Sequence, residues 1–369
     1  MSPGLYIHVP FCRSKCPYCG FYSVPSAAPV PIWFEGVKKE VLLYKGRFDQ
    51  FDSLYLGGGT PTFLDGRTLS GLVDHLFTHF DFAIDTEFTI EANPCDLTEE
   101  TVRLLKGMGC NRVNLGVQSF DDRALAFLGR CHTAEDAKEA MERLRRFGFD
   151  NVGVDLIYGL PEQSLDAWTD TLRCALSFQP EHISCYELTL ENGTVFARLQ
   201  DRGNLRPVSE EDGRACFLAT SRLLRGAGYI HYEVSNYARG EAYCSRHNRK
   251  YWEHVPYLGL GPSAHSFDGK DRWWNLRSIK GYGAELDRGR PPVEGRETLT
   301  GEQVRLESLA LGFRTREGVA LRHIASVPQS EEFLSRMEAA GLVKVREGRI
   351  IPTEEGFLMA DHLPLCFSG

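Results

Sequence analysis

The sequence has few of the features that commit a protein to a membrane, a nucleic acid or the cell exterior. No apolar run in its 369 residues is long enough to span a bilayer. Acidic residues outnumber basic ones by 50 to 42, and this net charge of −8 disfavours broad nucleic-acid binding, which requires an excess of Lys and Arg. The first residues contain neither the basic segment nor the long apolar segment of a secretory signal. We therefore expect a cytoplasmic protein without a nucleic-acid partner.

Cysteine is abundant, but its arrangement disfavours a disulfide framework and a zinc site. The count of eleven is odd, and the expected compartment is reducing. Nearly all of the eight scattered cysteines are expected to be small buried apolar side chains. A structural zinc site needs four ligands, typically two Cys-x-x-Cys pairs, and the chain has no second pair. Three cysteines remain, and these are clustered: Cys12, Cys16 and Cys19.

The clustered cysteines directly follow the first predicted strand. Pro17 disfavours a helix, so the segment is predicted to be a loop whose thiols surround one object. A cluster held by protein alone takes four thiolates, and three thiolates around four irons leave one iron open. The Cys-x3-Cys-x2-Cys spacing resembles the motif of the radical S-adenosylmethionine (SAM) superfamily. That resemblance implies a [4Fe–4S] cluster, held by Cys12, Cys16 and Cys19, whose open iron chelates SAM.

The first half of the chain alternates between short apolar segments and amphipathic ones. The alternation predicts helical crossovers between parallel strands, which suits a partial (β/α)6 barrel better than an open doubly wound sheet. Buried strands are predicted at residues 5–11, 53–58, 87–93, 112–118, 151–159 and 182–189. Helices are predicted at residues 33–47, 67–80, 98–108, 121–146 (as two helices) and 165–178.

The alternation fails after residue 192. We expect a partial barrel at residues 1–200, an accessory α+β region at 201–290 and a winged-helix-like module at 291–369. Within the last, helical segments at 301–313, 320–325 and 330–339 precede a hairpin that turns at Glu347 and Gly348, and a helix at 353–362 follows. The local charge is mixed, which favours a packing or lid role for this module over DNA binding.

Polar residues end several of the predicted strands, where a parallel barrel has its reactive face. Gly57-Gly-Gly-Thr-Pro61 follows the second strand, and glycines allow the backbone to approach a ligand closely. Glu91 and Gln118 end the next two strands, and Asp155 lies within the fifth. A carboxylate in an apolar strand needs a partner, because burying it unpaired is costly. A ligand or a structural hydrogen bond would meet this need.

Five motifs extend the resemblance to nearly the whole chain. They are similar to motifs of the oxygen-independent coproporphyrinogen III oxidase (HemN) family: Tyr6-Ile-His-Val-Pro-Phe-Cys12, Gly57-Gly-Gly-Thr-Pro-Thr62, Glu91-Ala-Asn-Pro94, Gly116-Val-Gln-Ser-Phe120 and Asp155-Leu-Ile-Tyr-Gly-Leu-Pro161. The resemblance implies that cluster-bound SAM contacts Tyr6, Gly58 and Glu91. It also implies that SAM or a second SAM is held by Tyr18, Gly59, Thr60, Gln118, Arg130, Asp155 and Thr189.

Three features depart from the oxidase. The chain begins almost at its first strand, without the longer N-terminal segment of the oxidase, and Phe21 stands where the oxidase has a further cysteine. The segment His247-Asn248-Arg-Lys-Tyr251-Trp252 is similar to the HNxxYW motif of the haem-chaperone (HemW) branch of the family. The resemblance to that branch implies haem as cargo and a haem-acceptor protein, such as a respiratory cytochrome, as partner.

Residue chemistry leaves the role of this motif open. His247 is a plausible axial ligand of haem iron, and Tyr251 and Trp252 suit a porphyrin face. Alternatively, His247 and Asn248 form a hydrogen-bonded loop while the two aromatic residues fill a core. Cys244 and His265 are further candidate iron ligands. Covalent c-type attachment is not indicated, because no Cys-x-x-Cys-His motif occurs.

Three functions follow from the resemblance. The first is a haem chaperone in which the cluster and SAM regulate haem transfer or oligomeric state, without assigned catalytic residues. The second is an enzyme that decarboxylates two propionates of coproporphyrinogen III through a deoxyadenosyl radical, and the third is an anaerobic haem-modifying enzyme. A homodimer is compatible with the sequence, as is peripheral attachment to the inner face of the membrane through a respiratory partner.

Overall fold

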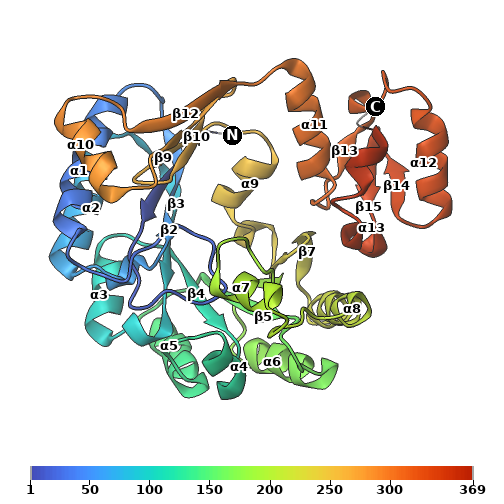
Figure 1. Ribbon diagram of the computed structural model, residues 1–369, viewed down its shortest axis with the longest axis horizontal. Coiled ribbons are helices and arrows are strands. Elements are labelled where there is room, and N and C mark those ends of the chain that lie inside the picture. The colour runs from blue at the N-terminus through green and yellow to red at the C-terminus, as the bar shows by residue number, and fades with distance from the viewer. Residues whose placement is uncertain (1, 368–369) are drawn as a thin grey trace.

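The alternating apolar and amphipathic segments form a curved sheet with helices on its outer side, as the computed structural model of residues 2–367 shows (Figure 1). Six adjacent parallel strands form its centre, in sequence order. Their bounds are β1 (Gly4–Val9), β2 (Phe51–Gly58), β3 (Phe82–Ala92), β4 (Arg112–Gln118), β5 (Val152–Tyr158) and β6 (His182–Glu187). All six predicted strands are confirmed. Only β3 begins well before its predicted start, because its first residues are partly or fully exposed and Asp85 interrupts their apolar character.

Helices cover the outer side of these strands. Their bounds are α1 (Val30–Tyr44), α2 (Gly66–His79), α3 (Glu99–Gly107), α4 (Asp122–Phe127), α5 (Ala134–Arg146) and α6 (Leu165–Ser177). Thr98 caps α3 at its predicted start, and Thr133 with Asp136 forms a capping box on α5, the second of the two helices predicted within 121–146. No helix in the described residues combines the length and the apolar character needed to cross a bilayer.

The region after residue 192 extends the same sheet at both edges. Its helices are α7 (Val195–Asp201), α8 (Glu210–Gly226), α9 (Arg246–Trp252) and α10 (Ile279–Asp287). Parallel to β1 lies β9 (Tyr257–Leu260), and β10 (His265–Phe267), β11 (Asp271–Asn275) and β12 (Val293–Thr298) continue from it as antiparallel strands. The other edge is formed by β8 (Asn236–Ala238) and β7 (Ile230–Glu233). Residues 230–298 therefore extend the barrel sheet at both edges, and β12 lies beyond the predicted boundary at residue 290. The region boundaries at 200 and 290 stay predictions.

The C-terminal segment forms a small module to one side of the barrel (Figure 1). Its elements are α11 (Gly301–Gly312), β13 (Val319–Ala320), α12 (Ser330–Ala339), β14 (Val343–Arg346), β15 (Arg349–Pro352) and α13 (Glu354–Leu358). The predicted hairpin turn is present, with φ of 50° at Glu347 and 73° at Gly348. The helical segment predicted at 320–325 is only a 3-10 turn, Leu321–His323. The module has its own apolar core, and its likeness to a winged helix stays a prediction.

Two cysteines depart from the expectation of free thiols. Cys95 and Cys131 form a disulfide that joins the loop after β3 to the loop before α5, with their Cα atoms 6.6 Å apart. The two loops follow neighbouring parallel strands, so the fold brings together residues that are 36 positions apart. Four other cysteines are buried, as expected of small apolar side chains: Cys110, Cys185, Cys216 and Cys244.

One buried carboxylate joins α1 to the extension of the sheet. Glu40 accepts hydrogen bonds from the Gly261 amide at 2.8 Å, from Asn275 Nδ2 at 2.7 Å and from the Tyr282 hydroxyl at 2.5 Å. Its complete burial raises its pKa to about 7, although the three donors favour the charged form. This carboxylate therefore costs stability when it ionises, even though it fixes the turn between β9 and β10.

We predict that Glu40→Gln reduces the pH dependence of folding stability. A pKa raised from 4.5 to about 7 means that the contribution of Glu40 is most favourable below pH 4.5 and is lost as the pH rises through 7. Gln cannot ionise, and its amide can donate to Asn275 Oδ1, which lacks a partner. The free energy of unfolding of the variant, measured by urea unfolding, should therefore rise relative to that of wild type by roughly 2 to 3 kcal/mol between pH 5 and pH 8. Glu35→Gln, on the exposed face of α1, is the control. The prediction would be contradicted if Glu40→Gln differed from wild type in free energy of unfolding by the same amount at pH 5 and at pH 8.

Candidate functional site

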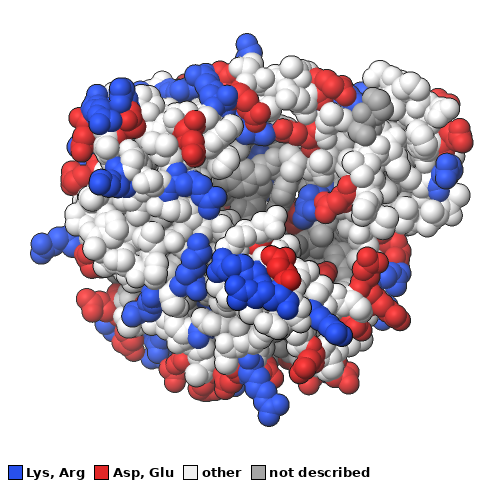
Figure 2. Space-filling view, viewed as in Figure 1, with Lys and Arg blue, Asp and Glu red and all other residues white. Residues whose placement is uncertain are grey.

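Two adjoining cavities open at the carboxyl ends of the parallel strands. The barrel cavity, about 430 Å³, lies inside the curve of β1–β6 beside the cysteine loop. The side cavity, about 490 Å³, lies between β1, α9 and the β9–β10 turn. The cavities share a wall that includes Phe21, Tyr55, Gly58, Glu91 and Asn248. Figure 2 shows this face of the molecule hollowed near its centre, over the region where Figure 1 labels α9.

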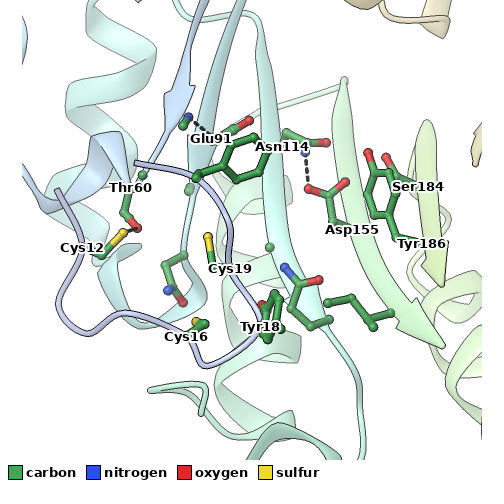
Figure 3. A pocket seen from close by; sticks show the side chains of 18 of the residues that line it. Cys12, Cys16, Tyr18, Cys19, Thr60, Glu91, Asn114, Asp155, Ser184 and Tyr186 are labelled. Carbon is green, nitrogen blue, oxygen red and sulfur yellow. Dashed lines mark hydrogen bonds between the residues drawn. The ribbon is translucent and has the colours of Figure 1, made fainter. Parts of the chain in front are cut away.

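The three clustered cysteines line the barrel cavity from one loop, as predicted (Figure 3). The Thr60 hydroxyl donates to Cys12 Sγ at 3.6 Å, and the Arg130 guanidinium donates to Cys16 Sγ at 3.5 Å. Burial raises the thiol pKa of Cys12 and of Cys19. Across residues 2–367, no three His, Cys, Asp or Glu side chains converge as ligands of a single metal ion would. Three thiols beside a cavity, with a cation next to one of them, fit a larger sulfur-bound cluster that keeps one position open.

The glycine turn after β2 is tied to the start of the cysteine loop. Gly59 N–H donates to Val9 O at 2.9 Å, and Thr60 N–H donates to Phe11 O at 2.7 Å. A Cβ atom at Gly59 would lie 2.5 Å from Val9 O and 2.7 Å from Phe11 O, both of which belong to the backbone. Gly58 has a φ of 96°, in the left-handed region that favours glycine. Both glycines are therefore required by geometry, one by close approach and the other by its backbone angle.

The two predicted carboxylates face the barrel cavity from β3 and β5 (Figure 3). Glu91 accepts from the Gly58 amide at 3.0 Å and from the Tyr55 hydroxyl at 2.8 Å, and burial raises its pKa to about 7. Asp155 accepts from Asn114 Nδ2 at 2.6 Å, and burial raises its pKa to about 6. Both carboxylates are thus poised to gain from a ligand that brings positive charge or hydrogen-bond donors.

Several buried polar atoms in the wall of the barrel cavity lack a partner among residues 2–367. They are Ser23 Oγ, Thr89 Oγ1, Arg130 Nε, Asp155 Oδ1 and His182 Nδ1. Buried polar atoms are normally paired, so these five indicate groups that a ligand would satisfy. A ligand with an ammonium, a carboxylate and ribose hydroxyls, as SAM has, offers both donors and acceptors for them.

The structure distributes the predicted cofactor residues over the two cavities. The barrel cavity is lined by Tyr18, Gly58, Gly59, Thr60, Glu91, Gln118, Arg130, Asp155 and Thr189. The side cavity is lined by Tyr6, His247 and Tyr251, and also by Gly58 and Glu91; Asn248 lines both cavities. Trp252 lines neither cavity and packs edge-on against Tyr232 at a ring distance of 5.9 Å.

Sequence reasoning missed several polar residues inside the barrel. Tyr55, Thr89, Asn114 and Ser184 lie within their strands and line the barrel cavity. Thr89 precedes Glu91 by two positions, and Asn114 precedes Gln118 by four, so each pair projects from the same face of its strand. Polar residues at every second position of an otherwise apolar strand were the signal that could have identified them.

The HNxxYW segment forms helix α9 rather than a loop. His247 is 1% exposed, and its ring is hydrogen-bonded on both sides, from Nδ1 to Ser53 Oγ and from Nε2 to the Tyr251 hydroxyl, each at 2.9 Å. Burial lowers its pKa to about 3, so the ring is neutral at pH 7. Cys244 lies in a buried cluster with Tyr232 and Ala238, outside both cavities. In this arrangement His247 has no free nitrogen for a ligand.

Comparison with known proteins establishes the class of the barrel. The sequence profile of the radical SAM superfamily matches residues 6–175. The solved structure of coproporphyrinogen III oxidase (HemN) from Escherichia coli, described as a radical SAM enzyme, superposes with a TM-score of 0.84 at 24% identity, covering 100% of this chain and 90% of that one. The fold is therefore the radical SAM α/β fold, in its HemN-like form.

Curated relatives narrow the class. Heme chaperone HemW from Mycobacterium tuberculosis is 34% identical over 99% of this chain and 95% of its own length. The heme chaperone HemW of Bacillus subtilis is 33% identical, and the match covers 99% of this chain and 98% of the relative. The heme chaperone HemW of Escherichia coli is 36% identical, and the match covers 71% of this chain and 69% of the relative. The chain belongs to the HemW family of the radical SAM superfamily. Membership in this superfamily implies a [4Fe–4S] cluster and SAM as cofactors.

We predict that Gly59→Ala destabilises the protein, because the new Cβ must displace the backbone of Val9 and Phe11. Overpacking of this kind costs about 1 to 3 kcal/mol. Gly107→Ala, in α3 with no atom within 4 Å of the added Cβ, is the matched control and should be neutral or slightly stabilising. Urea unfolding of the two variants measures the difference. Equal stabilities would mean that the glycine turn tolerates a side chain.

Proposed function

We propose that this protein is a haem chaperone that binds a [4Fe–4S] cluster, SAM and haem, and delivers haem to an acceptor protein such as a respiratory cytochrome. The observation that carries the proposal is the 34% identity to a heme chaperone over 99% of the chain. The side cavity supports it further, because its wall carries histidine, tyrosine and arginine side chains suited to a metalloporphyrin with propionates.

In this proposal Cys12, Cys16 and Cys19 hold the cluster. A [4Fe–4S] cluster held there would supply the electron for homolytic cleavage of SAM. The Arg130 guanidinium and the Thr60 hydroxyl donate to cysteine sulfurs, which places a positive charge and a hydrogen-bond donor beside the cysteine loop.

The remaining residues of the barrel cavity would orient SAM. Glu91 in its charged form is an acceptor for the SAM ammonium, beside the Gly58 backbone. Asp155 Oδ1 and Thr89 Oγ1, which lack partners among the described residues, are suited to the hydroxyls of the nucleoside. Gln118 and Tyr18 line the same cavity. Because Asn114 holds the other oxygen of Asp155, this carboxylate is fixed before any ligand arrives.

The shared wall provides a physical route by which SAM can regulate haem. Glu91 and Gly58 face both cavities, so a change in the charge or position of Glu91 is felt on both sides. The aromatic residues of the side cavity, including Tyr6 and Tyr251, are suited to a porphyrin plane. We therefore assign SAM and the cluster a regulatory role in haem transfer.

Replacing any one of the three loop cysteines by Ala should abolish cluster assembly, because two thiolates cannot hold the cluster. We expect about four irons per chain in the anaerobically reconstituted wild type, and less than one in each variant. Cys366→Ala, at an exposed position of the C-terminal module, is the matched control and should keep the full iron content. Full iron content in a loop variant would exclude that cysteine as a ligand.

Haem titration of the reconstituted protein tests the function itself. We expect saturation near one haem per chain, followed by transfer of that haem to a haem-free b-type cytochrome. An anaerobic assay with coproporphyrinogen III should give no protoporphyrinogen. Product formation without saturable haem binding would replace the chaperone with the decarboxylase.

A further inference from the structure

Three histidines line the side cavity, and only one of them has free ring nitrogens. His8 is hydrogen-bonded through Nδ1 to the Tyr6 hydroxyl at 3.0 Å and through Nε2 to the Tyr22 carbonyl at 2.8 Å. His247 is bonded on both sides, as described above. His265 has no side-chain hydrogen bond to any residue from 2 to 367. It is therefore the histidine in this wall that can ligate a metal without breaking an existing bond.

The position of His265 is fixed by the turn before it. Ser263 has a φ of 66°, an unusual angle for a residue other than glycine, and its amide donates to Leu276 O at 3.1 Å. The His265 ring stacks on Trp274 of β11 at 5.9 Å, with 25° between the ring planes. A ring supported on one face, with unbonded nitrogens at a cavity wall, is preorganised for a ligand.

Among residues 2–367, Arg277 is the one Lys or Arg side chain that lines the side cavity. Arg277 is exposed and lies over the Tyr22 ring, with its guanidinium 6.0 Å from the ring centre. It forms no ion pair or side-chain hydrogen bond with the described residues, unlike most arginines of the chain. An unpaired guanidinium at the rim of an aromatic cavity is suited to a carboxylate of the ligand.

The shared wall exposes a large apolar side chain. Phe21 is 68% exposed and lines both cavities. Exposed phenylalanine is unfavourable in water, so burial beneath a flat apolar ligand would recover free energy. His265, Arg277 and Phe21 thus offer a metal ligand, a carboxylate partner and an apolar contact in one cavity.

We propose that His265 is an axial ligand of haem iron, that Arg277 pairs with a haem propionate, and that the porphyrin lies in the side cavity against Phe21. This inference rests on the proposed haem-chaperone function and assigns its ligands. The assigned iron ligand is thus a residue that follows the β9–β10 turn, and not His247, whose two ring nitrogens are both hydrogen-bonded.

Spectroscopic titration with haem and with metal-free protoporphyrin IX distinguishes iron ligation by His265 from propionate binding by Arg277. In His265→Ala, haem affinity should fall at least 10-fold and the ferric spectrum should change, while metal-free porphyrin binds as in wild type. Added imidazole should restore the wild-type spectrum. Arg277→Gln should weaken both ligands about 5-fold, because it removes a propionate contact and leaves iron ligation intact. His323→Ala, in the C-terminal module, is the control and should match wild type.

A second substitution keeps the test decisive if His265→Ala folds poorly. His265→Tyr should retain haem with a phenolate-ligated spectrum, because tyrosine is itself a haem ligand. Two results would overturn the assignment of His265 while leaving the chaperone function intact. The first is a haem spectrum of His265→Tyr that is identical to that of wild type. The second is loss of iron ligation in His247→Ala while His265→Ala still binds haem as wild type does. Absence of haem binding by wild type would instead overturn the chaperone function.

Discussion

Two backbone hydrogen bonds hold the glycine turn after β2 against the start of the cysteine loop, from Gly59 to Val9 and from Thr60 to Phe11. They require backbone atoms to approach so closely that no side chain fits at Gly59. The same contact places the Thr60 hydroxyl on a cysteine sulfur, and the amide of the preceding glycine, Gly58, on Glu91. The arrangement of the barrel cavity therefore depends on this junction, because it aligns the elements that carry the sulfur ligands with those that carry the carboxylates.

The carboxylates explain how one cavity can influence the other. Glu91 and Asp155 are both buried and repel each other, and burial raises the pKa of both. A cationic ligand in the barrel cavity relieves that strain and favours ionised Glu91. Because Glu91 also forms part of the side-cavity wall, its charge and hydrogen bonds change the surface presented to a second ligand. In the proposed function, this shared residue is the means by which bound SAM would influence haem binding.

The parts of the fold that the sequence predicted are those governed by local pattern. Continuous apolar strands and capped amphipathic helices identified the six βα units, and the parallel arrangement then brought Glu91, Gln118 and Asp155 to one edge. The outer strands could not be found in this way. Residues 293–298 alternate between partly and fully exposed positions, and they form β12 only through pairing with β11. Long-range geometry likewise decided that Cys95 meets Cys131, and that the His247 nitrogens are occupied by Ser53 and Tyr251.

The haem site proposed in the side cavity lies directly beside the cluster site proposed in the barrel cavity. The most direct test is the fluorescence of zinc protoporphyrin IX, which accepts one axial ligand, bound to the protein with and without its [4Fe–4S] cluster. A cluster absorbs light and accepts electrons, so it quenches a porphyrin held close to it. We predict equal porphyrin binding in the two forms and strongly reduced emission in the cluster-loaded form. Equal emission from both forms would contradict the account, because the porphyrin would then lie far from the barrel cavity.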